Sequence, residues 1–110
     1  MVTLTSFGYH YGQPTGLVVD ARSLHNPHRQ FKGLSGLDKS VQDSVLSQAG
    51  AAAKVRLILR WAEKYGSVSC GCGWGRHRSV AIVEEAARLL KAQGIEVNII
   101  HRDLSLNSTR

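Results

Sequence analysis

The chain has 110 residues, with 14 Lys and Arg against 8 Asp and Glu, which gives a formal charge of +6 at pH 7. The length suits one domain, and the sequence has neither an apolar run long enough for a membrane helix nor the basic, apolar start of a signal peptide. We therefore exclude a membrane-spanning protein, expect a cytoplasmic one, and expect anionic partners such as phosphorylated metabolites, nucleic acid or acidic protein surfaces.

The first half of the chain predicts two strands and two loops. Residues 2–7 alternate apolar and polar side chains, as a half-buried strand does. Residues 8–14 are rich in Gly and predict a loop, and the apolar run 17–20 predicts a short second strand. Residues 22–34 show no period and carry several basic side chains, so we expect a polar, basic loop there.

The second half of the chain alternates predicted helices and strands. A short helix over residues 38–48 precedes a stronger one over residues 51–65, whose apolar side chains fall on one face. Residues 67–70 predict a strand, a helix begins at residue 78 or 79 and is closed by Gly94, and residues 95–99 predict a last strand. We therefore expect a single α/β domain, in which helices pack on a small, mostly parallel sheet of about four strands.

A glycine-rich segment joins the third predicted strand to the last predicted helix. It reads Cys-Gly-Cys-Gly-Trp-Gly-Arg-His-Arg-Ser over residues 70–79. Alternating glycines allow backbone N–H groups to turn inward, and a helix N-terminus attracts anions. Basic side chains crowded at that terminus oppose the helix dipole unless an anion offsets them. The segment therefore predicts an anion-binding loop rather than a simple turn, with these candidate ligand-binding residues: Gly73, Gly75, Arg76, His77, Arg78 and Ser79.

The same segment contains a Cys-x5-Arg pattern that resembles protein tyrosine phosphatases, in which a low-pKa cysteine attacks phosphorus. A cysteine-dependent phosphatase is therefore the alternative hypothesis, with Cys72 as nucleophile and Arg78 gripping the phosphate. The histidine that usually precedes the cysteine is Gly71 here, and the pattern places no general acid. We expect the side chains of Cys70 and Cys72 to point to opposite faces of the strand, reduced and without a disulfide.

A second candidate segment, Asn26-Pro27-His28, follows the second predicted strand and so lies at a strand's carboxyl end. The proline holds Asn26 extended, which fixes how His28 is presented to the same pocket. The simpler interpretation is an exposed loop with solvated histidines. His25 and His28 match no strong zinc spacing, so we expect no metal.

A third candidate segment, residues 101–103, follows the last predicted strand. Asp103 could orient either His101 or Arg102 by a hydrogen bond and so support the pocket. The simpler interpretation is a charged chain end without a role in binding.

Several of these segments taken together resemble a known family. Their order and their spread over nearly the full chain are similar to the C-terminal domain of the RapZ family, the RNase adapter proteins and their relatives. On this basis we expect a RapZ C-terminal-like domain over residues 1–104 and a polar tail over residues 105–110. The matching segments are Thr5-Ser-Phe-Gly-Tyr-His-Tyr-Gly, Val19-Asp-Ala-Arg, Asn26-Pro-His, Leu34-Ser-Gly-Leu-Asp, Gly71-Cys, Gly75-Arg-His-Arg-Ser-Val and His101-Arg-Asp-Leu.

The resemblance implies a non-catalytic sensor or adapter that binds a phosphosugar such as glucosamine 6-phosphate. It further implies RNA or a regulatory protein as partner, self-association, and no cofactor. Full-length family members begin with a nucleotide-binding domain that carries a Walker-type loop, and these 110 residues contain no such loop. We therefore expect a stand-alone domain that does not hydrolyse ATP. The residues that the resemblance places around the phosphosugar are His28, Cys72, Gly73, Trp74, His77 and Arg78.

The chain departs from the family at two places. The family usually has Thr-Gly where this chain has Gly73-Trp74, which removes a hydroxyl and adds a bulky ring at the rim of the pocket. The relatives that bind RNA end in a tail rich in Lys and Arg, whereas residues 104–110 read Leu-Ser-Leu-Asn-Ser-Thr-Arg. The residues that still offer a basic surface are Arg29, Lys32, Arg56, Arg60 and Arg102.

Overall fold

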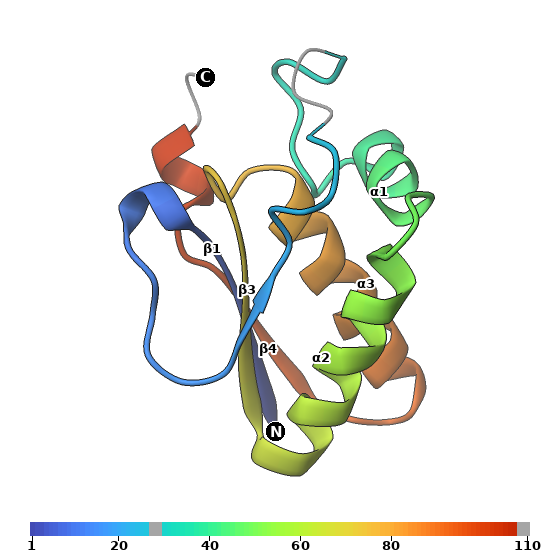
Figure 1. Ribbon diagram of the computed structural model, residues 1–110. Coiled ribbons are helices and arrows are strands. Elements are labelled where there is room, and N and C mark those ends of the chain that lie inside the picture. Colours follow the sequence, from blue (N-terminus) through green and yellow to red (C-terminus); the bar gives the residue numbers. More distant parts are fainter. Residues whose placement is uncertain (27–29, 108–110) are drawn as a thin grey trace.

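Four parallel strands form the centre of the computed structural model, which describes residues 1–26 and 30–107 (Figure 1). In the sheet order β2–β3–β1–β4, each neighbouring pair of strands is parallel. Helices connect the strands, so the predicted α/β class is confirmed. The elements in chain order are β1 (Val2–Gly8), the 3-10 turn η1 (Tyr9–Tyr11), β2 (Val18–Asp20), α1 (Lys39–Leu46), α2 (Ala51–Tyr65), β3 (Ser67–Cys72), α3 (Arg78–Ala92), β4 (Val97–His101) and the 3-10 turn η2 (Leu104–Asn107).

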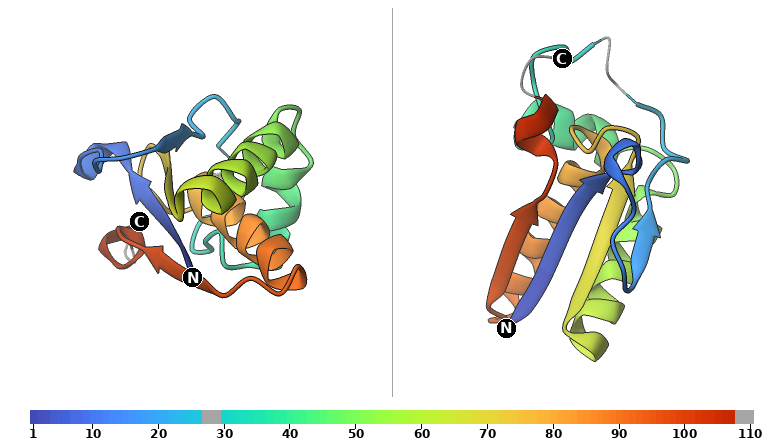
Figure 2. Two further views of the ribbon diagram at one scale, coloured as in Figure 1. Left: turned by 90° about the horizontal axis from the view of Figure 1, so that it is seen from below. Right: turned by 90° about the vertical axis from the view of Figure 1, so that its left-hand side faces the viewer.

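The three helices lie on one face of the sheet (Figure 2). In β1 the alternation of side chains explains this arrangement, because Leu4 is buried in the core while Thr3 and Thr5 on the opposite face are partly exposed. The helices contribute Ile58 and Ile82 to the same core. Among the described residues, no helix is long and apolar enough to cross a membrane.

The observed element bounds differ from the predicted ones mainly at strand ends. The helix over residues 51–65 is confirmed at both ends. β3 runs two residues beyond its predicted end, to Cys72. Residues two apart on a strand share a face, so the expectation that Cys70 and Cys72 point to opposite faces is wrong. Both thiols are free and buried in the core beneath the helices.

The end of β1 and the loop that follows β3 touch backbone to backbone. A Cβ added to Gly8 would lie 2.4 Å from the carbonyl carbon of Trp74, and a Cβ on Gly75 would lie 2.7 Å from the amide nitrogen of Gly8. Gly75 also has φ +74°, in the left-handed region that L side chains rarely adopt. Because neither position has room for a side chain, the loop lies directly on the end of the strand.

We predict that Gly75→Ala destabilises the protein far more than Gly73→Ala. The left-handed backbone alone costs about 1–2 kcal/mol at residue 75, and the contact of its Cβ with Gly8 adds to that loss. Residue 73 has neither a positive φ nor a backbone atom near its Cβ position, so its substitution changes the free energy of unfolding by about 0.5 kcal/mol or less. Urea unfolding measures both values, and equal losses in the two variants would contradict the backbone contact.

Candidate functional site

The loop over residues 73–77 lies at the carboxyl end of the sheet, where open α/β sheets bind ligands. It leaves β3 after Cys72 and enters α3 at Arg78, and η1 lies at the same end of the sheet (Figure 1). The backbone joins the loop to η1, because the His10 N–H donates to the Gly73 carbonyl at 3.0 Å. The predicted arrangement of strand, glycine-rich loop and helix is therefore present, and its loop sits beside the end of β1.

The alternating glycines of this segment have different surroundings. Gly71 lies beneath the Phe7 ring, with 2.4 Å between a ring carbon and the position of an added Cβ, and Gly75 lies on the end of β1. These two glycines are needed for packing inside the protein. Around Gly73, apart from the adjoining residues of the chain, the only atom of the described residues within 4 Å of an added Cβ is Nη2 of Arg78, at 3.4 Å. Of the three, Gly73 alone leaves space beside a charged group.

The Arg78 guanidinium makes its hydrogen bonds to described residues through one nitrogen, Nη1. Its Nη1 donates to the carbonyls of Arg22 and Leu24, at 3.0 and 2.9 Å. Among the described residues, its buried Nε has no hydrogen-bond partner and no group accepts a bond from its Nη2. Nε and Nη2 form the edge that grips an anion with two parallel bonds. Arg78 therefore presents an unused bidentate edge next to Gly73.

The side chain of Arg22 shows how the same edge behaves when a carboxylate is within reach. Its Nε and Nη2 donate to the Asp20 carboxylate at 3.1 and 2.8 Å. These hydrogen bonds hold the pKa of Asp20 below its ordinary value. The comparison indicates that the Arg78 edge is suited to an anion that this part of the protein does not itself supply.

The side chains of Arg76 and His77 hold the loop that precedes α1. Both side chains are buried, and Arg76 Nε and His77 Nε2 each lie 2.9 Å from the carbonyl oxygen of Leu34. The Gly36 N–H donates in turn to the Arg76 carbonyl at 2.8 Å. The positive charge at this helix terminus is thus partly balanced by backbone carbonyls. These contacts were not predicted from the sequence. The roles of Arg76 and His77 in ligand binding stay predictions.

Cys72 and Ser79 form a buried pair under the loop. The Cys72 side chain is 2% exposed, and its sulfur lies 3.2 Å from the Ser79 hydroxyl and 3.4 Å from the Ser79 amide nitrogen. Ser79 Oγ also donates to the Phe7 carbonyl at 3.4 Å, so the pair ties β3, α3 and β1 together. Burial raises the pKa of the neighbouring thiol, Cys70, well above its ordinary value. Both sulfurs are therefore positioned as parts of the core.

The second predicted half of the pocket, Asn26-Pro27-His28, lies only partly within the described residues. Asn26 belongs to the described residues, and its Oδ1 is buried without a hydrogen-bond partner. Pro27 and His28 lie outside the described residues, so the placement of His28 stays a prediction. The bonds from Arg78 to the carbonyls of residues 22 and 24 hold the chain just before this segment at the N-terminus of α3.

His101 joins the sheet to α3 instead of facing the loop. Its Nδ1 lies 2.7 Å from the Ser6 hydroxyl, and its Nε2 lies 2.8 Å from a Glu84 carboxylate oxygen. Ser6 is fully buried, so these three side chains form a structural polar bridge. Neither Ser6 nor Glu84 was predicted from the sequence as a partner of His101. The alternation of β1 carried a signal, since it places a serine on the buried face, where a hydroxyl needs a partner.

Asp103 supports the end of β1. Its Oδ2 accepts from the Gly8 N–H at 2.8 Å, and its carboxylate accepts two bonds from Arg102, at 2.9 and 2.7 Å. Arg102 Nη2 also lies close to the carbonyl of Gly12, at 2.6 Å. Of the two neighbours that Asp103 was expected to orient, it binds Arg102. The buried carboxylate thus holds the strand end on which the loop lies.

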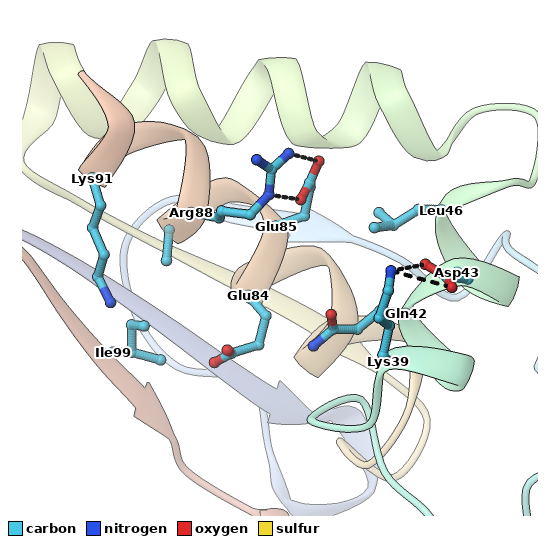
Figure 3. Close-up of a pocket in the computed structure, with 10 residues that line it drawn as sticks. Lys39, Gln42, Asp43, Leu46, Glu84, Glu85, Arg88, Lys91 and Ile99 are labelled. Carbon is cyan, nitrogen blue, oxygen red and sulfur yellow. Dashed lines mark hydrogen bonds and ion pairs between the residues drawn. The ribbon is translucent and has the colours of Figure 1, made fainter.

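A groove of about 600 Å³ lies elsewhere, between α1, α3 and β4 (Figure 3). Two ion pairs lie within the groove, Lys39 with Asp43 and Arg88 with Glu85. It does not include the loop over residues 73–77. Within the described residues, no three His, Cys, Asp or Glu side chains are grouped to hold a metal ion.

Comparison with known proteins matches nearly the whole chain. The family model of the RapZ C-terminal domain matches residues 1–105. A nucleotide-binding protein of Thermobifida fusca is 42% identical over 116 residues, which cover 92% of this chain and 40% of that protein. A nucleotide-binding protein of Geobacter metallireducens is 41% identical over 118 residues, which cover 94% of this chain and 41% of that protein. The chain thus spans about two-fifths of the length of these curated relatives.

We predict that Asp103→Ala lowers the free energy of unfolding by about 2–3 kcal/mol, because it leaves the buried Gly8 N–H without its acceptor and removes the ion pair with Arg102. Asp43→Ala is the matched control, since it removes an exposed carboxylate paired with Lys39, at a cost of about 0.5 kcal/mol or less. Urea unfolding of both variants checks this. A loss at Asp103 as small as that of the control would show that the carboxylate does not hold the strand end.

Proposed function

Because the chain belongs to the RapZ C-terminal domain family, we propose that it is a non-catalytic binding module for a phosphosugar such as glucosamine 6-phosphate. The observation that carries the proposal is the Nε–Nη2 edge of Arg78, which is charged, partly buried and unused beside the open space at Gly73. A buried donor without a partner costs about 1–3 kcal/mol, which an anion at that edge would recover.

Three features of the site favour a phosphoryl group over other ligands. The guanidinium edge matches two oxygens of a phosphate. α3, a helix of 15 residues, begins at Arg78, so its positive end lies beside the same guanidinium. The formal charge of +6 attracts anions from a distance. Each feature alone is common, and their coincidence at Gly73 supports a phosphate site.

The names of the relatives agree with this ligand chemistry at the level of the phosphoryl group. They are called nucleotide-binding proteins, and a nucleotide carries the same group as a sugar phosphate. Since this chain spans about two-fifths of their length, their names do not tell which part of those proteins holds the nucleotide. We therefore rest the proposal on the site and not on the names.

Phosphatase chemistry at Cys72 is the weaker alternative. A nucleophile must reach the phosphorus in line, whereas the Cys72 side chain is 2% exposed and its sulfur is engaged with Ser79. Burial of this kind favours a role for the sulfur in lining the site.

RNA is the second partner that we propose, on the family resemblance and on two arginines. Arg56 and Arg60 are exposed one turn apart on α2, and Lys32 is exposed in the loop before α1. Arg102, in contrast, is engaged with Asp103, and Arg29 lies outside the described residues. If these side chains bind the RNA backbone, affinity falls at least about tenfold between 50 and 200 mM salt. Gel retardation of a single-stranded RNA measures this, and no retardation at low salt would contradict it.

We predict that Arg78→Gln and Gly73→Val each weaken phosphate binding by about tenfold to a hundredfold. The first change removes the charged edge, and the second fills the space beside it without altering the arginine. Arg60→Gln is the matched control, because it removes an equal charge from the exposed face of α2 and leaves affinity within about twofold.

Calorimetry with inorganic phosphate and with glucosamine 6-phosphate checks this prediction. Thermal unfolding of each variant confirms that the fold is intact, since Arg78 also holds the carbonyls of residues 22 and 24. Wild-type affinity in folded Gly73→Val protein would show that the ligand does not lie at this position.

A further inference from the structure

Three ring side chains gather beside the proposed phosphate site. The rings of His10 and Trp74 have centroids 3.8 Å apart and are tilted by 41°. The Tyr11 ring is steeply inclined to both, with its centroid 5.0 Å from that of His10 and 6.1 Å from that of Trp74. The His10 side chain is exposed and the other two are partly exposed, so this cluster lies at the surface and outside the core.

Gly73 connects the ring cluster to the unused edge of Arg78. On one side its carbonyl accepts the His10 N–H at 3.0 Å, and on the other its Cβ position lies 3.4 Å from Arg78 Nη2. Trp74 is the next residue, and its backbone is fixed by the contact with Gly8. The ring cluster and the guanidinium edge therefore flank the same residue, Gly73.

The backbone itself holds the loop in place, through the contact between Gly8 and Gly75 and the bond from His10 to Gly73. A phosphate alone also gains nothing from an aromatic neighbour. An indole at the edge of an anion site is typical of pockets that take a ring attached to the phosphate, because flat faces stack on it.

We infer that Trp74, backed by His10, determines the specificity of this site by stacking on the ring of a phosphorylated ligand. The inference rests on the proposed function, since it needs the phosphoryl group at Arg78. The shared chemistry of the ligand is a ring with a flat apolar face joined to a phosphate, which a hexose phosphate and a nucleotide both offer. It predicts that the chain discriminates cyclic from acyclic phosphates.

Calorimetry with four probes tests the inference. We expect wild-type protein to bind glucosamine 6-phosphate about tenfold more tightly than glycerol 3-phosphate, which lacks a ring. In Trp74→Leu the ratio falls to about twofold while the affinity for inorganic phosphate stays the same, and in Trp74→Phe most of the preference returns. The affinity for AMP, compared with that for glucosamine 6-phosphate, shows whether a base or a sugar ring stacks more favourably.

Fluorescence provides a readout that does not depend on altering Trp74. The chain has two tryptophans, so Trp61→Phe leaves Trp74 as the sole tryptophan. Trp61 lies on α2, away from the loop. We expect glucosamine 6-phosphate to change the emission of this variant and inorganic phosphate to change it much less. In Trp74→Phe, where Trp61 remains, neither ligand changes the emission.

The outcomes separate the inference from the proposed function. An unchanged preference in folded Trp74→Leu protein, or silent Trp74 emission while calorimetry shows hexose phosphate binding, overturns the inference alone. Failure of inorganic phosphate to bind, or full affinity in Arg78→Gln, overturns the proposed function and the inference with it. Loss of the ring preference in Trp74→Leu with phosphate binding retained supports both.

Discussion

The contact between the backbones of Gly8 and Gly75 sets the geometry of the whole site. It presses the loop after β3 onto the end of β1, at a distance that excludes any Cβ. Asp103 holds the same strand end from the other side by accepting the Gly8 N–H. With the loop fixed in this way, Gly73 comes to lie beside α3 and Trp74 beside η1. The site therefore depends on close packing of main chain more than on any side chain.

The basic residues at the start of α3 divide their roles. Arg76 and His77 bind the Leu34 carbonyl and fix one loop, while Arg78 binds the carbonyls of residues 22 and 24 and fixes another. Arg78 does so with Nη1 only, which immobilises its guanidinium and leaves the other edge unused. A ligand at that edge meets a group that is already oriented, so little conformational entropy is lost on binding.

Sequence patterns predicted the elements better than the contacts among them. Periodicity predicted the helix over residues 51–65 at both ends, because local spacing decides a helix face. The end of β3 was missed because glycines at positions 71 and 73 indicate a loop, whereas Gly71 stays in the strand to make room for the Phe7 ring. The acceptors of Arg78 lie more than 50 residues away in sequence and are backbone carbonyls, which no side-chain pattern reveals. The predicted arrangement of strand, glycine-rich loop and helix is present, and its role as an anion site stays a prediction.

NMR of the Arg78 Nε–H group tests most directly whether this buried donor is kept for an anion. In ¹H–¹⁵N spectra of the free protein, we expect an Nε–H resonance protected from exchange, because the atom is buried. Titration with phosphate should shift this resonance strongly downfield as the bond forms, and Gly73→Val should abolish the shift. A resonance that stays in place while phosphate saturates the protein would contradict this role of the donor.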